Sequence, residues 1–186
     1  RQQHPGLQIQ ITEGPLDELQ TLLRNGQIEM ALLYDIDLDR DLECDPLAQV
    51  EPHVLLPAGH RLADQASVSL RALRKEPFIL LDLPHSRDYF LGFFQKVGFE
   101  PKVRHRSRSF ELVRGLVASG EGYSILNLQP ASHQTYDGGE VKCLPIKDKV
   151  SPLSIVLAQP LGLRQTHRAS AFVSCCRAYF DSLNQD

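Results

Sequence analysis

The sequence predicts an α/β fold, because strand-like and helix-like apolar patterns alternate along the chain. Leu7, Ile9 and Ile11 alternate with polar residues, which is the period of a strand. Leucines then recur at helical spacing over residues 16–23, and an apolar run over residues 28–33 indicates a buried strand. Strand, helix and strand in this order indicate a βαβ unit with parallel strands, whose ligand sites lie at the strands' carboxyl ends. Those ends are expected near Thr12 and Tyr34.

The same alternation continues to the end of the chain. An acidic loop is expected over residues 35–45, and "PAGHRLAD" and residues 134–139 are expected to be surface turns. A helix that starts near Ser86 carries four apolar residues on one face and ends at Gly98. Ser109 and Thr166 are predicted N-caps of two further helices. Short strands are expected at 54–56, 78–81, 103–107, 123–126, 141–146 and 153–158, with a short helix around 70–73.

Composition indicates a globular chain that does not bind nucleic acid by itself. The 186 residues are 42% hydrophobic and 23% charged, a balance that supports a buried core. The formal net charge is -3 and basic residues are spread along the chain, whereas a duplex binder needs a concentrated cationic face. No apolar run approaches the roughly 18 residues that would cross a bilayer. Arg1 is not an initiator methionine, so we expect a fragment of a longer protein.

The residues show no signature of catalysis, of a metal site or of a cofactor. Seven histidines lack the i,i+4 spacing of a helical zinc site, and neither a Gly-x-Ser-x-Gly elbow nor a phosphate-binding glycine loop occurs. His60 is interpreted as a turn residue. The four cysteines show neither zinc-ligand spacing nor the density of a secreted disulfide scaffold, which favours a reducing cytoplasm. Adjacent Cys175 and Cys176 are interpreted as small apolar core residues, with a redox switch as the alternative.

Four stretches resemble one known family when they are taken together and in order. They are "HPGLQIQITEGPLDELQTLLRNGQIEMALL" at 4–33, "VLLPAGHRLAD" at 54–64, "VSLRALRKEPFILL" at 68–81 and "SFELVRGLVASGEGYSIL" at 109–126. With them the chain resembles the effector-binding domain of LysR-type transcriptional regulators. The resemblance implies two Rossmann-like lobes of the type II periplasmic-binding-protein kind, joined by two crossover strands, with the effector in the cleft between them. It places residues 1–76 and 158–186 in lobe one and residues 77–157 in lobe two.

Two departures from the family pattern affect the expected site. The family usually has a strand and a helix before the "HPG" segment, and the loop after that strand contributes to the effector site. This chain starts too late to contain them, so we expect weakened effector binding. Asn127 stands where the family often has proline, which adds a polar group near the cleft.

The resemblance also implies which residues surround the effector. The loops at 12–16, 33–35, 83–87 and 108–110 supply most of them. The candidates are Thr12, Glu13, Gly14, Pro15, Tyr34, His85, Ser86, Arg108, Ser109, Phe110 and Asn127. Helix starts at Ser86 and Ser109 would offer amide donors to an anion, although either serine could simply cap its helix. Arg108 is the best partner for a carboxylate, so the expected effector is a small carboxylate.

Some of these residues carry an alternative interpretation. Lys102, Arg104 and Arg106 alternate with Arg108, and a solvated strand face is favoured for them. Tyr34 could close the pocket or be buried in lobe one. Phe90, Phe93 and Phe94 are interpreted as core or dimer contacts rather than as a ligand box.

For the whole protein, the family implies a homodimer or tetramer that binds DNA through an absent N-terminal winged helix-turn-helix domain, not through this fragment. The expected dimer contacts are the strand Leu7–Ile11 and the helix Asp88–Val97. Two other classes of function stay open: a periplasmic solute-binding protein for a small anion, and an enzyme on the same fold. The upstream sequence would separate a solute-binding protein from a regulator, since the first needs a secretory leader and the second a basic winged helix-turn-helix domain. The expectation is a cytoplasmic regulator domain with no cofactor, no metal and no membrane partner.

Overall fold

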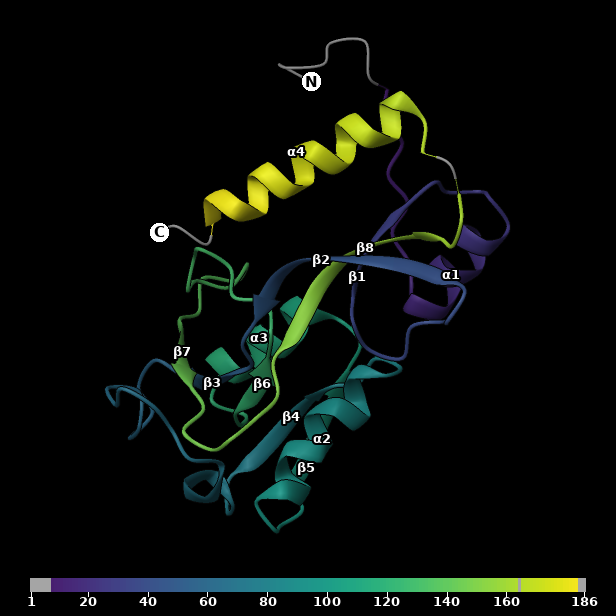
Figure 1. The fold of residues 1–186 in the computed structure, drawn as a ribbon. Coiled ribbons are helices and arrows are strands. Elements are labelled where there is room, and N and C mark those ends of the chain that lie inside the picture. The colour runs from purple at the N-terminus through teal and green to yellow at the C-terminus, as the bar shows by residue number, and fades with distance from the viewer. Residues whose placement is uncertain (1–7, 164, 184–186) are drawn as a thin grey trace. The chain divides into compact units, whose positions relative to one another are not determined.

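The computed structural model describes residues 8–163 and 165–183, and the chain divides into two compact units (Figure 1). Unit 1 comprises residues 1–49 and 154–186, and unit 2 comprises residues 50–153. The chain passes between the units within two strands, β2 (Leu42–Val50) and β8 (Leu153–Pro160). The resemblance placed these boundaries at 76/77 and 157/158. The first observed boundary lies earlier, because residues 53–57 form a strand that pairs with two strands of unit 2.

Unit 1 is a three-stranded sheet with a helix packed on each of two apolar clusters. The strand order is β1 (Ala31–Tyr34), β8 and β2, and β1 runs antiparallel to β8. Helix α1 (Leu16–Arg24) buries Leu23 against Leu33 and Val156. Helix α4 (His167–Leu183) buries Val173 against Leu157, the neighbour of Val156 along β8. Because successive side chains of a strand point to opposite faces, α1 and α4 cover opposite faces of this sheet.

The N-terminal βαβ prediction is wrong in its first strand. Residues 8–11 have no regular secondary structure, Ile9 and Ile11 are exposed, and Leu7 lies outside the described residues. A strand needs a hydrogen-bonded neighbour, and the described residues offer none to this segment. The helix and the second strand form as predicted, but β1 pairs antiparallel with β8. The expected acidic loop is also shorter than predicted, since β2 already begins at Leu42.

Unit 2 is a mixed sheet of five strands. Two groups, β6–β3–β7 and β4–β5, are joined by a parallel bridge between Phe78 and Tyr123, which gives the order β5–β4–β6–β3–β7. Strands β4 and β5 are parallel, and β3 is antiparallel to both of its neighbours. The strands are β3 (His53–Pro57), β4 (Pro77–Leu81), β5 (Lys102–Ser107), β6 (Ser124–Leu126) and β7 (Val141–Pro145). Leu70–Leu73 form the expected short helix, as one 3₁₀ turn.

Two helices cover the two faces of this sheet. Helix α2 (Ser86–Lys96) places Phe90, Phe93 and Phe94 in a cluster with every second residue of β3 and β4, such as Phe78. Helix α3 (Phe110–Ala118) packs Val113 and Val117 against the intervening residues, such as Ile79. The interpretation of the three phenylalanines as core residues is confirmed. The three-layer arrangement leaves the starts of both helices beside the carboxyl ends of β4 and β5 (Figure 1).

Candidate functional site

Three parallel strands of unit 2 end at one edge of its sheet. β4 is parallel to β5, and the bridge from Phe78 to Tyr123 makes β6 parallel to β4. Just beyond the strand ends, the amide of Asp82 donates to the carbonyl of Ser107 at 2.8 Å. Six of the predicted site residues directly follow these ends: His85 and Ser86 after β4, Arg108, Ser109 and Phe110 after β5, and Asn127 after β6. The topology therefore gathers these six at one edge, which is where ligands bind in sheets of this kind.

The other five predicted residues belong to unit 1. Thr12, Glu13, Gly14 and Pro15 are exposed and directly precede α1, with Pro15 at its N-cap. Tyr34 ends β1 and is half-buried, and this burial raises the pKa of its phenol. Their contact with an effector stays a prediction.

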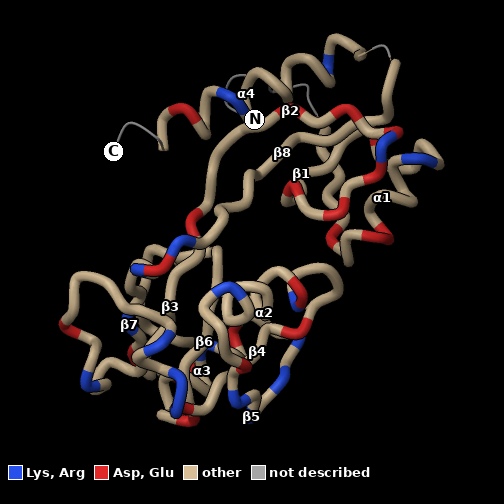
Figure 2. Tube along the Cα trace, turned by 60° about the horizontal axis from the view of Figure 1, so that its bottom comes forward, with Lys and Arg blue, Asp and Glu red and all other residues tan. Residues whose placement is uncertain are grey.

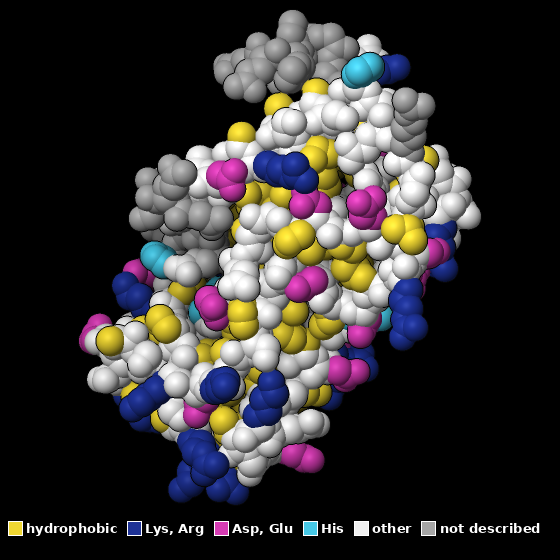
Figure 3. Space-filling model, viewed as in Figure 1, with side chains coloured by type: hydrophobic (Ala, Val, Ile, Leu, Met, Phe, Trp, Pro, Cys, Tyr) yellow, Lys and Arg dark blue, Asp and Glu magenta, His cyan; other side chains and the backbone are white. Residues whose placement is uncertain are grey.

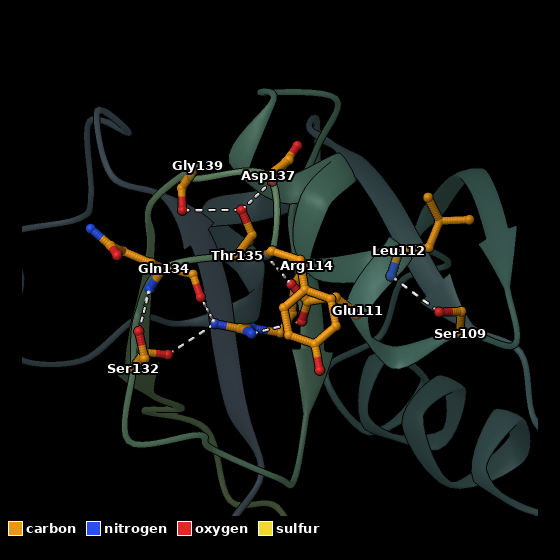
Figure 4. Close-up of polar contacts among 10 residues, drawn as sticks. Ser109, Glu111, Leu112, Arg114, Ser132, Gln134, Thr135, Asp137 and Gly139 are labelled. Carbon is orange, nitrogen blue, oxygen red and sulfur yellow. Dashed lines mark hydrogen bonds and ion pairs between the residues drawn. The ribbon is translucent and has the colours of Figure 1, made fainter.

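The start of α3 has the features of an anion site. Ser109 is the N-cap, and its Oγ accepts from the amide of Leu112 at 3.3 Å, so the predicted cap is confirmed (Figure 4). The amide of Val113 donates to the carbonyl of Ser109 at 3.1 Å. The amides of Phe110 and Glu111 have no acceptor among the residues that the structure describes. A helix start with unpaired amides attracts a negative charge.

The start of α2 differs from the start of α3. His85, not Ser86, is the N-cap, and its side chain makes no capping bond, so the capping interpretation of Ser86 is wrong. The amides of Ser86 and Arg87 donate to the carbonyls of Pro84 at 2.7 Å and Leu83 at 3.1 Å. His85 has a φ of 64°, a left-handed conformation that is uncommon for any residue other than glycine. This tight turn satisfies its own amides, so α3 is the better anion site.

The basic residues of β5 differ in their partners. Lys102, Arg104 and Arg106 occupy exposed alternate positions, as predicted (Figure 2). Arg104 pairs with Glu121 at 3.0 Å, and Arg106 pairs with Asp82 at 3.4 Å. Arg108 is exposed, and no carboxylate among the described residues pairs with it. Arg108 precedes Phe110, whose amide is the first unpaired amide of α3, by two residues. Its guanidinium can therefore pair with an external carboxylate.

Asp82 was not predicted as part of this edge, although it directly follows a buried strand. It binds Arg87 at the start of α2 as well as Arg106. Partial burial favours the neutral acid, but the hydrogen bonds and charges of the two arginines outweigh it and lower the pKa of this carboxyl. The ionised Asp82 therefore pairs with two arginines at once, whereas Arg108, just beyond the end of β5, has no carboxylate partner among the described residues.

Asn127 connects the end of β6 to α2 and to a chain crossing. Its Nδ2 donates to the carbonyl of Val50 at 3.4 Å and to the hydroxyl of Tyr89 at 3.2 Å. The Tyr89 hydroxyl in turn donates to the carbonyl of Ser151 at 2.8 Å. The Oδ1 of Asn127 is buried and has no hydrogen-bond partner among the described residues. No pattern in the sequence identifies Tyr89 as a neighbour of the candidate site.

A buried arginine holds the loop after β6 against α3 (Figure 4). The side chain of Arg114 is 5% exposed, and it pairs with Glu111 at 2.7 Å. It also donates to the carbonyls of Ser132 at 3.0 Å and Gln134 at 2.9 Å. Glu111 additionally accepts from the amide of Tyr136 at 2.7 Å. The i,i+3 spacing of Glu111 and Arg114 was the available signal, and the pair fixes the first turn of α3.

His53 is a second buried polar residue at the same edge. It is the first residue of β3, its Cα is paired with that of Leu126, and it is 6% exposed. Burial lowers the pKa of its imidazole to about 4, against a smaller opposing effect of a hydrogen bond to the backbone of Glu51. The ring is therefore neutral at pH 7, and its Nε2 has no partner among the described residues.

Other kinds of site are not found in the part of the chain that the structure describes. No group of three or more metal-ligating side chains occurs there, and all four cysteines are free thiols. Cys176 is partly buried and packs against the apolar cluster under α4, in agreement with the core interpretation, whereas Cys175 is partly buried and is not among the described residues of the apolar clusters. None of the described helices has the length and apolar character to span a membrane. On the face in Figure 3, acidic and neutral side chains separate many of the basic ones.

Comparison with known proteins identifies the family. The model of the LysR substrate binding domain matches residues 1–181. A crystal structure of HinK, a LysR family transcriptional regulator from Pseudomonas aeruginosa, is 42% identical with a TM-score of 0.92, covering 97% of this chain and 63% of that one. The C-terminal domain of a probable LysR family regulator from Rhodococcus sp. RHA1 is 31% identical with a TM-score of 0.89, covering 94% and 86%.

A curated relative agrees with these structures. The uncharacterized HTH-type transcriptional regulator YnfL of Escherichia coli is 28% identical over 176 residues, covering 92% of this chain and 58% of its own length. The chain thus spans less than two thirds of YnfL and of HinK. The fold with two α/β units and two connecting strands agrees with the type II periplasmic-binding-protein class. The chain belongs to the LysR substrate-binding domain family.

Proposed function

We propose that the chain is the effector-sensing domain of a LysR-type transcriptional regulator and that it binds a small carboxylate without transforming it. The observation that carries the proposal is the unpaired Arg108 beside the unpaired amides of α3, at the edge where three parallel strands end. Guanidinium binds carboxylates through two parallel hydrogen bonds, and the helix start adds donors of the same polarity.

Solved effector-binding domains of the same fold support this class of ligand. QuiR holds shikimate and BenM holds benzoate, both of which are carboxylates, at 20% and 22% identity to this chain. These two proteins suggest which compounds to test first. Because the relatives are named as transcriptional regulators, a regulator is favoured over a solute-binding protein or an enzyme on this fold.

The remaining expectations for the whole protein are part of the proposal. The full-length regulator works in the cytoplasm as a homodimer or tetramer and contacts DNA through an N-terminal winged helix-turn-helix domain. The formal net charge is -3 and the basic residues are spread along the sequence, so this chain alone should not shift a DNA duplex in a gel at physiological salt. The exposed face of α2 carries Arg87, Asp88, Gln95 and Lys96, so a dimer contact there would be polar.

The test compares two variants that each remove one exposed positive charge, Arg108 just beyond the end of β5 and Lys102 at its start. Arg108→Ala should weaken binding of a carboxylate effector by roughly tenfold to a hundredfold, because a charged hydrogen bond contributes on the order of 1.5–3 kcal/mol. Lys102→Ala is the control, since it lies at the opposite end of the strand, about 20 Å away. Calorimetric titration with mono- and dicarboxylates measures both. Equal losses in the two variants, or none in Arg108→Ala, would reject the anion site.

A further inference from the structure

We infer that the side-chain carbonyl of Asn127 accepts a hydrogen bond from the effector, so that the domain prefers carboxylates that also carry an O–H or N–H group. This inference rests on the proposed effector site and adds a second chemical requirement to it. The carboxylate is held by Arg108 and α3, whereas the donor group is recognised by an amide at the end of β6.

The orientation of the Asn127 amide is set by its neighbours. Nδ2 points at the carbonyl of Val50, which can only accept, so a flipped amide would place two acceptors against each other. Tyr89 favours the same orientation, because its single hydroxyl proton goes to the carbonyl of Ser151 at 2.8 Å. The hydroxyl is then available to Nδ2 as an acceptor, at 3.2 Å. Both protons of the amide are therefore used within unit 2, and Oδ1 has a fixed position.

Oδ1 itself is a buried acceptor without a donor among the described residues. Such an atom has lost its hydration without gaining a hydrogen bond, which is unfavourable unless another group supplies the proton. Asn127 itself belongs to the ligand edge, since it directly follows β6 and its Nδ2 donates to Tyr89 of α2. A donor on the effector would satisfy Oδ1, and an effector without one would leave it unpaired.

Sites built in this way reject analogues that lack the donor, because the buried polar group of the protein then stays unpaired. A hydrophobic contact at this position would discriminate far less. A residue without a side-chain acceptor at this position, such as proline, could not make this hydrogen bond, so the preference depends on the asparagine.

Matched pairs of carboxylates test the inference directly. Lactate and propionate, 4-hydroxybenzoate and benzoate, and pyrrole-2-carboxylate and furan-2-carboxylate differ mainly in one donor. Calorimetric titration should show that the pair of suitable size favours its donor-bearing member by about tenfold. Asn127→Ala should bring that ratio close to one, and the ratio rather than either single affinity is the measured result. Asn25→Ala, at the C-cap of α1 in unit 1, is the matched control and should keep the wild-type ratio.

Tyr89→Phe provides a second variant that keeps Asn127 and the aromatic contacts with Phe90 and Phe93. It removes one acceptor of Nδ2, so the amide is less firmly oriented and the ratio should fall by about threefold. Carboxylates that bind with equal affinity within every pair, or a preference that persists in Asn127→Ala, would overturn the inference but leave the effector domain intact. If no carboxylate binds at all, both the inference and the proposed function fail.

Discussion

At the scale of single residues, unit 2 is distinguished by polar side chains buried at or near its ligand edge. Arg114 is compensated by Glu111 and by two backbone carbonyls, so removing one partner would leave the other with an unmet hydrogen-bonding requirement. His53 is compensated differently, because its ring stays neutral instead of gaining a counter-ion. Because His53 is buried without a carboxylate partner, its contribution to the stability of the folded chain depends on pH.

The first prediction concerns that sensitivity. The pKa of His53 is lowered from 6.5 to about 4 on folding, so the unfolded chain binds the additional proton between these values. Stability is then fully present above pH 6.5 and decreases as the pH falls toward 4, by about 3 kcal/mol if only this group titrated. Urea denaturation of the wild type and of His53→Gln between pH 7 and 5 measures the effect.

The substitution should flatten the pH dependence, whatever its effect on stability at pH 7. His133→Gln, an exposed histidine of the loop after β6, serves as the control and should keep the wild-type slope. A slope that is the same in His53→Gln and in the wild type would show that another group is responsible.

At the scale of elements, the junction of β4 and β6 depends on one glycine. A Cβ at Gly122 would lie 2.3 Å from the carbonyl oxygen of Pro77, which is itself bonded to the amide of Tyr123 at 3.0 Å. This backbone approach joins the two parts of the unit 2 sheet and thereby brings the end of β6 to the end of β4. The position of Asn127 in the candidate site follows from it.

Gly122→Ala should therefore destabilise the chain by about 2–4 kcal/mol, because backbone atoms rather than a flexible side chain must move. Gly92→Ala is the matched control: no atom lies within 4 Å of its added Cβ, and alanine in a helix is favoured over glycine by about 0.5–1 kcal/mol. Urea denaturation of both variants checks the difference. If Gly122→Ala proves as stable as Gly92→Ala, the close approach is not required for this junction.

Local patterns predicted most elements, and long-range pairing explains the failures. The caps at Ser109 and Thr166 and the helix end at Gly98 were identified because capping depends on neighbours within a few residues. The strand expected at Leu7–Ile11 has the right period, yet the described part of it is not paired. Periodicity describes one strand and not its neighbour, so neither this failure nor the antiparallel pairing of β1 could be predicted.

The candidate site shows the same limit. Parallel strand ends with Arg108, Ser109 and Asn127 could be predicted, because helix starts and strand ends are visible in the sequence. The pairing of Asp82 with Arg87 and Arg106, the role of Tyr89 and the burial of His53 depend on segments that are far apart in the sequence. These contacts decide which cation stays unpaired and which acceptor stays unsatisfied.

At the scale of the whole molecule, the chain passes from unit 1 to unit 2 within β2 and returns within β8. Within unit 2, Asn127 donates to the carbonyl of Val50 and Tyr89 donates to the carbonyl of Ser151, and both acceptors lie next to the points where the chain crosses. An effector that contacts Asn127 therefore acts on a residue that is already bonded to one crossing.

The central claim is that a small carboxylate binds where β4, β5 and β6 end, and amide chemical shifts of the labelled chain test it most directly. Titration with the tightest-binding carboxylate should shift the amides of Phe110 and Glu111 and the side-chain amide of Asn127. It should leave those at the opposite end of β5, around Lys102 and Val103, unchanged. Saturable shifts around Lys102 with none at Phe110, or no shift with any carboxylate, would contradict the account.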